Sequence, residues 1–570
     1  MPERRRSRAA GRATDPVTAA TIATALVATT GEMSESLRRS SYSPIIREML
    51  DFSCAIFTPE GEITAQAETI PALLGAMSFA VRAIVDDHPR DTIQPGDIFI
   101  VNDPYRGGTH TPDIHIFGPI FAADRLIGWS GTLAHHADIG GTNPGTEGYA
   151  NRSIFEEGLR FPPIKLFEAG RPVAPLMRYI EGNVREPRAT LGDLRAQVAA
   201  VKLGTTRVLG LVERYGLKAF EAASAGVLDR GERRLRAAIA SRPDGRATAI
   251  GHLDDDGLGG GPIAIVATVE VRGDTVSVDF EGTDPQMGGG LNASRSAVMA
   301  AVLFAVKAVF DPDAPANGGN ARPIRVNLPP GTVVNPAYPA AVSLRHLTAQ
   351  RITDTVVRAF ADLYPETGVA GAFVGFSSLT AEGRHPRTGL ATVPQDDCGG
   401  GMGGTSDGDG LDAVDTYLGN VGLLPIEICE LQYPIRILRT ELLPDSGGPG
   451  RFRGGLGMVR EYEFLDDCDL VAYTEQTRAE FAAWGAHGGL AATAASILLH
   501  RADGREERIT KTRTRVGAGD RIVISTGGGG GFGTPHDRDP ALVRRDVREG
   551  KVSAASAAAV YGVEAEASGS

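Results

Sequence analysis

Residues 102–120 read NDPYRGGTHTPDIHIFGPI, and the apolar run DIFIV (97–101) precedes them. The Asp-Pro step and the Gly pair indicate a turn, and the apolar residues on both sides indicate strands. Two His and two Asp occur in or next to this turn. The stretch fits three interpretations: a phosphate-binding loop, a metal site, or a simple connection between two strands.

The metal interpretation starts from His110 and Asp113, three residues apart in the turn. An imidazole and a carboxylate suit Zn²⁺, Mn²⁺ or Fe²⁺, but two ligands do not make a site. The segment LAHHADIGG (133–141) offers His135, His136 and Asp138. In an extended segment the two His point to opposite faces, so only one can face the pair, and the other is left for a supporting or acid–base role. The alternative is a chance pair, with His110 capping a turn.

Asp103, Gly107 and Gly108 belong to the same turn. Glycines allow the backbone to approach a ligand closely, or to adopt a left-handed turn. We therefore expect these residues to form the wall of a substrate pocket, with a purely structural turn as the alternative.

Two other glycine-rich stretches are weaker candidates for binding sites. STGGGGGFGTP (525–535) lacks the Lys and Ser/Thr of a phosphate loop, and DCGGGMGGTSDGDG (397–410) lacks that Lys too. The second stretch is either a mobile active-site loop or a linker. Cys54 has no His near it in the sequence, so a catalytic thiolate is not expected.

Bulk properties exclude several classes of protein. The net charge of −12 gives no general attraction to nucleic acid. The four cysteines lack the spacing of a zinc ribbon and fit a reducing, cytoplasmic setting. The basic start lacks a signal-peptide core, and no run of about 20 apolar residues predicts a membrane span.

Hydrophobic periodicity predicts strands and helices without a regular βαβ rhythm. Hairpins are expected at 52–65 and 262–282, and helices at 17–41, 73–87, 190–240, 293–310, 345–364, 538–549 and after 553. We expect an irregular α+β fold with several lobes, rich in strands and Gly-rich loops. The predicted divisions are a disordered basic tail (1–16), a metal-binding lobe (17–215), a middle α+β lobe (216–345) and a Gly-rich C-terminal lobe (346–570).

A series of segments in chain order resembles the hydantoinase B family over about residues 17–563. The segments are DFSCAIF (51–57), PALLGAM (71–77), PGDIFIVNDPYRGGTH (95–110), AHHADIGG (134–141), FPPIKL (161–166), LGDL (191–194), DSGGPGRFRGGLG (445–457), GGGGGFG (527–533) and YGV (561–563). The sequence departs from the family pattern at GNVGLLPIEICE, where Asn420 and Pro425 are set apart.

The resemblance implies a subunit that works with an ATP-using hydantoinase A-type partner in a hetero-oligomer. In this family the partner phosphorylates an amide or ketone oxygen, and the B-type chain completes either ring hydrolysis or carboxylation. The resemblance to acetone carboxylase implies a metal on His110, Asp113 and His135. The length of 570 residues and the double His of AHHAD favour the branch of hydantoinases and 5-oxoprolinases.

The expected function is therefore hydrolysis of a small cyclic amide after its phosphorylation with ATP by the partner. A divalent Mn, Zn or Fe ion on His110, Asp113 and His135 would activate water, and His136 or Asp138 would hold or move the proton. Two alternatives stay open: a carboxylase subunit, and a non-catalytic scaffold of an ATPase complex.

Overall fold

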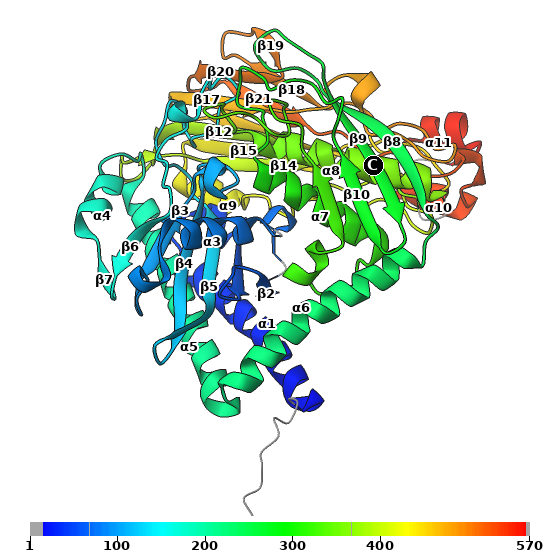
Figure 1. Cartoon of the computed structure of the whole chain (residues 1–570). Helices are drawn as coiled ribbons and strands as arrows, with labels where there is room; N and C mark the ends of the chain where they lie inside the picture. The colour runs from blue at the N-terminus through cyan, green and yellow to red at the C-terminus, as the bar shows by residue number, and fades with distance from the viewer. Residues whose placement is uncertain (1–14, 68, 74, 366–367, 566–570) are drawn as a thin grey trace, which may run out of the picture.

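The computed structural model describes residues 15–67, 69–73, 75–365 and 368–565. Within them four β-sheets and their helices form a mixed α/β protein, which confirms the predicted fold class (Figure 1). All but the last two residues of the predicted basic tail lie outside the described residues, and helix α1 begins at Pro16. None of the described helices is both long and apolar enough to cross a bilayer.

The first sheet has seven strands and carries the turn at 102–112 between two of them. Every neighbouring pair is antiparallel. The spatial order is β2 (Ile63–Gln66), β1 (Phe52–Phe57), β5 (Arg125–His135), β4 (Asp113–Ala122), β3 (Ile98–Val101), β6 (Ile164–Glu168) and β7 (Arg171–Pro172).

Helices cover both faces of this sheet, and its central strands are therefore buried over most of their length. On one face α1 (Pro16–Ser40) and α5 (Pro187–Tyr215) pack on the strands and on each other, and α3 (Ala76–Asp87) covers the other face. Two short helices, α2 (Pro44–Arg47) and α4 (Ala174–Glu181), complete this part. The apolar residues that predicted α1, such as Ile22, Leu26 and Met33, are buried in it.

The second sheet has the order β11 (Ile324–Asn327), β10 (Thr275–Asp279), β9 (Ile263–Arg272) and β8 (Gly245–Leu253). Its inward side chains alternate with outward ones along β9, as the sequence predicted. Three helices surround it: α6 (Leu217–Ala240), α7 (Arg295–Phe310) and α8 (Arg345–Leu363). Helix α8 packs against β8, β9 and α7, although the predicted division at 345–346 groups it with the C-terminal part. The divisions themselves stay a prediction.

The C-terminal part contains two five-stranded sheets with a shared apolar core. One has the path β13 (Ala391–Thr392), β12 (Phe376–Arg384), β17 (Cys468–Tyr473) and β20 (Lys511–Val516), with β14 (Gln395–Gly399) also paired to β12. The other has the order β15 (Ile435–Leu442), β16 (Met458–Phe464), β21 (Arg521–Ser525), β18 (Ser496–His500) and β19 (Glu506–Ile509). The remaining helices are α9 (Ile426–Gln432), α10 (Pro540–Arg548) and α11 (Ala554–Tyr561).

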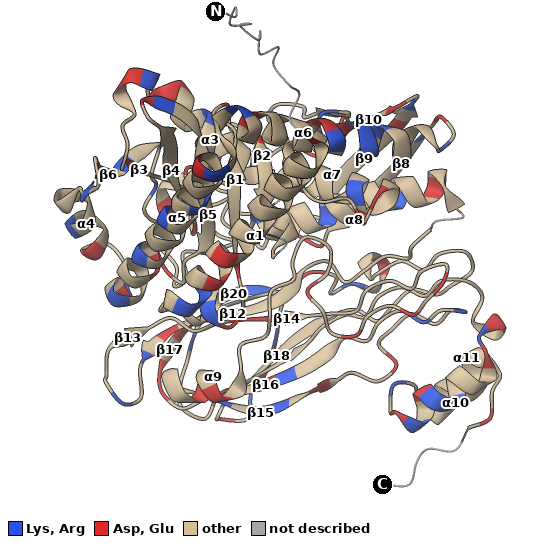
Figure 2. Ribbon diagram, turned by 90° about the horizontal axis from the view of Figure 1, so that it is seen from below, with Lys and Arg blue, Asp and Glu red and all other residues tan. Residues whose placement is uncertain are grey.

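Figure 2 shows the first two sheets and their helices on one side of these C-terminal sheets. Acidic and basic residues are spread over the outside rather than gathered on one face.

Four glycine-rich segments (400–404, 447–455, 485–489 and 527–533) pack side by side, and we call them the glycine core. Their backbones exchange hydrogen bonds outside any strand, for example Gly455 N to Met402 O (2.8 Å) and Gly529 N to Gly455 O (2.9 Å). A Cβ on Gly454 would lie 1.8 Å from the carbonyl oxygen of Gly529. The sequence indicated Gly-rich loops in this part of the chain, whereas these segments pack backbone against backbone and are largely buried, with 485–489 partly exposed.

Candidate metal centre

The hairpin of β4 and β5 brings the predicted ligands together. Asp113 is the first residue of β4, His135 is the last residue of β5, and the two are direct cross-strand partners. His110 lies in the preceding turn, and its carbonyl accepts a hydrogen bond from the backbone N–H of Asp113 (3.2 Å). Partners in an antiparallel pair have Cα atoms about 4.5–5.5 Å apart, so their side chains can share one ligand.

The distances between these side chains match those around a small cation. His110 Nε2 lies 3.1 Å from Asp113 Oδ1, and His135 Nδ1 lies 3.2 Å from the same oxygen. Ligands about 2.0–2.2 Å from a common metal ion are themselves about 3.0–3.4 Å apart in octahedral or tetrahedral geometry. Both distances are therefore compatible with binding of one divalent ion, as well as with the ion pair and hydrogen bond that these groups make without one.

The protonation of His110 points to the same conclusion. Its Nδ1 lies 2.8 Å from the carbonyl oxygen of Ser343, and a carbonyl can only accept, so Nδ1 carries the proton. Nε2 makes no hydrogen bond in the described part of the chain, although Asp113 Oδ1 is close to it. A cation between Nε2 and the carboxylate of Asp113 would satisfy both atoms.

The second oxygen of Asp113 is held by two donors. Arg345 donates to Oδ2 over 2.7 Å, and the hydroxyl of Thr109 donates to the same atom. Burial raises the pKa of Asp113, but the charges of His110 and Arg345 and the imidazole hydrogen bonds outweigh it and hold the pKa well below its usual range. Asp113 is therefore an ionised carboxylate with a fixed orientation.

The pKa of His135 is shifted upward, whereas that of Asp113 is shifted downward. Burial lowers its pKa, but the hydrogen bond to Asp113 and the charges of Asp51 and Asp113 raise it to about 9. In the metal-free protein His135 therefore holds a proton near neutral pH, and a metal ion must displace it.

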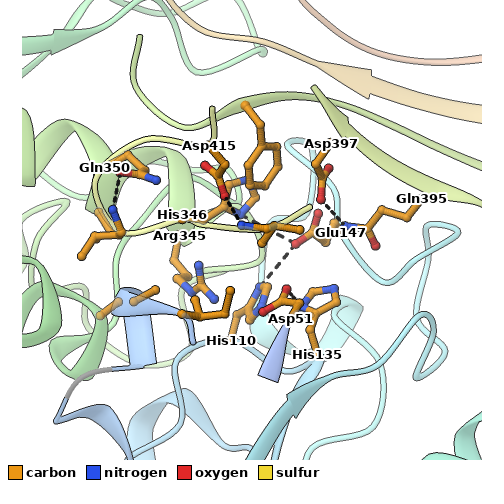
Figure 3. A pocket seen from close by; sticks show the side chains of 18 residues that line it. Asp51, His110, His135, Glu147, Arg345, His346, Gln350, Gln395, Asp397 and Asp415 are labelled. Carbon is orange, nitrogen blue, oxygen red and sulfur yellow. Dashed lines mark hydrogen bonds and ion pairs between the residues drawn. The ribbon is translucent and has the colours of Figure 1, made fainter. Parts of the chain in front are cut away.

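The same cavity contains polar residues that the sequence did not single out as ligands (Figure 3). Asp51 immediately precedes β1, and its Oδ2 lies 3.9 Å from His135 Nδ1. Glu147 Oε1 lies 3.5 Å from His110 Nδ1, and the hydroxyl of Tyr473 donates to its Oε2 (2.6 Å). No ligand spacing in the sequence pointed to these two positions, although Asp51 begins DFSCAIF, one of the segments that resemble the family.

Two sets of metal ligands are possible, and both include His110 and His135. His110, His135 and Glu147 bring ligand atoms within 4.8 Å of one another. Glu147, however, faces Nδ1 of His110, whose proton is donated to Ser343. Asp113 faces the free Nε2, so its carboxylate is the better partner in the set.

The first turn of α8 forms another side of the cavity. Arg345 and His346 both line it, and the ring of His346 stacks on Phe376 with 4.9 Å between centroids. Burial, and then the charge of Arg345, hold the pKa of His346 well below its usual value, so this ring is neutral. These residues are more than 200 positions from the hairpin in sequence, and only the packing of α8 brings them there.

The far wall carries Gln395, Asp397 and Asp415, which Figure 3 shows across the cavity from His110, His135 and Asp51. The cavity volume is ≈ 50 Å³, which holds an ion and a few waters but is smaller than the roughly 300–1,000 Å³ of ordinary ligand pockets. Binding of a ring-sized molecule therefore requires some of the lining side chains to shift.

The structure does not bring His136 or Asp138 into this cavity. His136 points to the opposite face from His135, as strand parity predicted, and its Nε2 donates to Gln197 Oε1 (3.0 Å). Asp138 is buried and paired with Arg185 (2.8 Å). Both side chains support the backbone next to His135 rather than face a ligand beside it.

Asp103, Gly107 and Gly108 also lie away from the lining of the cavity. Asp103 Oδ1 accepts from the backbone N–H of Tyr105 (2.9 Å) and caps a short turn. A Cβ on Gly107 would lie 2.5 Å from the backbone of Ala80, and one on Gly108 2.4 Å from the carbonyl oxygen of Asn102. The glycines are needed where the turn packs against its own chain.

The remaining motifs do not form competing sites. Cys54 is buried, and burial raises the pKa of its thiol to about 12, so it is not an available thiolate. His115 lies inside β4, where burial lowers its pKa to about 4. The glycines of 525–535 belong to the glycine core, so they do not form a phosphate loop.

Comparisons with known proteins agree on one family. The family model described as Hydantoinase B/oxoprolinase matches residues 15–535. A protein of Pseudomonas sp. strain NS671, provisionally named as the B chain of a D-/L-hydantoinase, is 33% identical, covering 96% of this chain and 95% of that protein. The beta chain of caprolactamase from Pseudomonas jessenii is 32% identical, with 97% of each chain covered.

Solved structures show the same relationship. The crystal structure of ATP-dependent caprolactamase from Pseudomonas jessenii matches with a TM-score of 0.91 at 30% identity, over 98% of this chain and 97% of that chain. Nucleotide-free acetone carboxylase matches with a TM-score of 0.89 at 22% identity, over 96% of this chain and 79% of that chain, which shows a common fold. The protein belongs to the hydantoinase B/oxoprolinase family.

Proposed function

We propose that this chain is the catalytic B-type subunit of an ATP-dependent enzyme that hydrolyses a cyclic amide. An A-type ATPase partner would first phosphorylate the ring amide oxygen, and the two chains would form a hetero-oligomer. The names of the relatives support this proposal, because one is a chain of a caprolactamase and another a chain of a hydantoinase. The observation that carries it is the free Nε2 of His110 facing Asp113 across 3.1 Å.

His110, Asp113 and His135 would hold a divalent ion, either Mn, Zn or Fe, and Asp51 is close enough to add a fourth oxygen. When bound, such an ion lowers the pKa of water and supplies hydroxide near neutral pH.

The surrounding residues would fix the geometry. The carbonyl of Ser343 holds the tautomer of His110, and Arg345 and Thr109 hold the carboxylate of Asp113. Supporting groups of this kind orient ligands and tune their affinity. Glu147 lies beside His110 and His346, and Tyr473 holds it. It would therefore contact a bound substrate or its water rather than the ion.

We revise the roles expected for the other residues. His136 and Asp138 would position the strand end that carries His135, since both are engaged with Gln197 and Arg185. Asp103, Gly107 and Gly108 would shape the turn that carries His110 rather than contact substrate.

The test is ATP-dependent ring opening by the complex co-purified with its A-type partner, on hydantoin, 5-oxoproline and caprolactam. We expect Asp113→Ala to lose both the metal and ring opening, while the control His536→Ala, at an exposed site, keeps both. An Asp113→Ala complex with full metal content and full rate would contradict the proposal.

The same assay separates the alternatives. A carboxylase would need bicarbonate and a ketone and would yield no ring-opened product. A scaffold would be purified without metal, and its Asp113 variant would behave like the wild type.

A further inference from the structure

Strand β14 presents two polar side chains to the cavity from its far wall. Gln395 and Asp397 are two residues apart, so they share one face of the strand, and both line the cavity. Asp396, between them, points the other way and pairs with Arg460 (3.1 Å). Gln395 and Asp397 are only 5% and 4% exposed.

Both side chains have an oxygen without a partner in the described residues. Gln395 Nε2 donates to Asp397 Oδ2 (3.4 Å), which leaves Asp397 Oδ1 and Gln395 Oε1 unpaired. A buried polar atom left unpaired destabilises the fold, so such atoms normally have a function or a ligand. Burial raises the pKa of Asp397 well above its usual value and outweighs the opposing effect of the Ser378 hydroxyl; Oδ1, which makes no hydrogen bond in the described residues, can carry the proton.

The pair therefore offers one donor and one acceptor next to each other. A protonated Asp397 Oδ1 can donate, and Gln395 Oε1 can accept. This combination suits a ring nitrogen, which carries one N–H and one lone pair once water has added to the neighbouring carbon. His110 and His135 lie on the opposite side of the cavity, where the carbon would be attacked (Figure 3).

The reaction in the proposed function creates a need for such a pair. Water adds to the carbon of the phosphorylated ring, the C=N electron pair moves to nitrogen, and nitrogen takes up a proton. The adduct then carries a hydroxyl, a phosphoryl ester oxygen and the ring N–H on one carbon. Two of its bonds can break with different results.

Breaking the C–O bond expels phosphate and restores the cyclic amide, so ATP is consumed without ring opening. Breaking the C–N bond opens the ring and leaves an acyl phosphate, which a second water hydrolyses to a carboxylate and phosphate. Phosphate leaves readily as an anion, whereas an amine leaves only when its nitrogen is protonated. A proton donor at nitrogen therefore decides the outcome.

We propose that Asp397 donates this proton to the ring nitrogen, while Gln395 accepts the N–H and orients it. Asp397 would thus commit the adduct to ring opening and couple phosphate release to product. The electron pair of the C–N bond goes to nitrogen, the hydroxyl of the adduct loses its proton to solvent as the carbonyl forms, and the carboxylate of Asp397 recovers its proton from the second water. The inference rests on the proposed function. It identifies Asp397 as the residue that prevents consumption of ATP without ring opening.

The test compares wild-type, Asp397→Asn and Asp397→Glu complexes on whichever of hydantoin, 5-oxoproline and caprolactam the wild type opens. Phosphate and ring-opened product are counted together, in water labelled with ¹⁸O. For Asp397→Asn we expect ring opening to fall about 100-fold or more, with phosphate release changed by less than about threefold. The recovered cyclic amide should carry ¹⁸O, because expulsion of phosphate leaves the added oxygen on carbon.

The conservative variant and a control make the result specific. Asp397→Glu keeps an acid and should recover part of the coupling, and Asp466→Asn, at an exposed site, should release one phosphate per ring opened like the wild type. One phosphate per product in Asp397→Asn, or equal losses of phosphate and product with unlabelled amide, would overturn the inference. If Asp397→Asn does not assemble, Asp397→Ala takes its place: phosphate release without ring opening supports the inference, and one phosphate per ring opened at the wild-type rate overturns it. If the wild type opens no ring, the proposed function itself fails.

Discussion

The hairpin of β4 and β5, which carries the proposed metal ligands, and the glycine core, which is largely buried, are held together in different ways. In the hairpin of β4 and β5 the backbone forms a regular antiparallel ladder, and side chains such as Asp113 and His135 meet across it. In the glycine core the backbones themselves meet, and a single Cβ at Gly454 would come within 1.8 Å of a neighbouring carbonyl oxygen.

The difference shows which changes each region can tolerate. The hairpin depends on the chemistry of a few side chains, so a substitution there alters the site and leaves the ladder in place. The glycine core depends on the absence of side chains, so even a methyl group must displace backbone. Because Gln395 and Asp397 precede the core segment 400–404 in one continuous stretch, the core also fixes the far wall of the cavity.

The largest effect is expected for Gly454→Ala. Its Cβ would overlap the carbonyl of Gly529, and no flexible side chain is there to move. We expect a loss of about 4 kcal/mol or more in the free energy of unfolding, or insoluble protein. The control is Gly210→Ala in α5, where nothing lies within 4 Å of the added Cβ. It should be stable or slightly stabilised in thermal unfolding, and equal behaviour of the two variants would contradict the close packing of the core.

A smaller effect, on the metal rather than on folding, is expected for Asp51→Asn. Its carboxylate lies 3.9 Å from His135 Nδ1, at the edge of the ligand set. We expect metal affinity, measured by competition with a chelator, to fall about 10–100-fold, with the midpoint of thermal unfolding of the metal-free protein nearly unchanged. Unchanged affinity would exclude Asp51 from the site.

Metal binding should also depend on pH. In the metal-free protein His135, with a pKa raised to about 9, holds a proton that the metal must displace. Apparent affinity should therefore fall about tenfold for each unit as pH drops from 8 to 6, and level off above about pH 9. Isothermal titration in buffers of different ionisation enthalpy counts the released proton, and a pH-independent affinity would show that His135 is not a ligand.

The smallest effect on catalysis is expected for His136→Asn. His136 bonds to Gln197 and does not line the cavity. We expect a loss of about 1–3 kcal/mol in the free energy of unfolding from the altered buried contact, with kcat within about threefold of wild type and full metal content. A large fall in kcat with normal stability would instead support the acid–base role that the sequence first suggested.

The sequence predicted the parts of the site that depend on local geometry. The spacing of His110 and Asp113, and the opposite faces of His135 and His136, follow from a turn and a strand. The periodic helices and the hairpins were predicted for the same reason. The alternation of side chains along a strand predicts that His136 faces away from His135, but it does not predict which residues His136 contacts. The proposed catalytic role of His136 and Asp138 therefore had no support from local geometry.

The rest depends on tertiary structure. Arg345 and His346 reach the cavity only because α8 packs on the second sheet, and Gln395 and Asp397 only because β14 pairs with β12. A glycine-rich segment considered by itself indicates a turn. Its packing cannot be predicted, because its backbone hydrogen bonds go to other segments far along the chain. No local pattern carries those contacts.

The most direct test of the central claim is anomalous diffraction from crystals of the protein loaded with Mn²⁺ or Zn²⁺. We predict one strong anomalous peak within about 2.0–2.3 Å of His110 Nε2, Asp113 Oδ1 and His135 Nδ1. A peak beside Glu147 and His346 that leaves Asp113 paired only with Arg345, or no peak between the two His at saturating metal, would contradict the account.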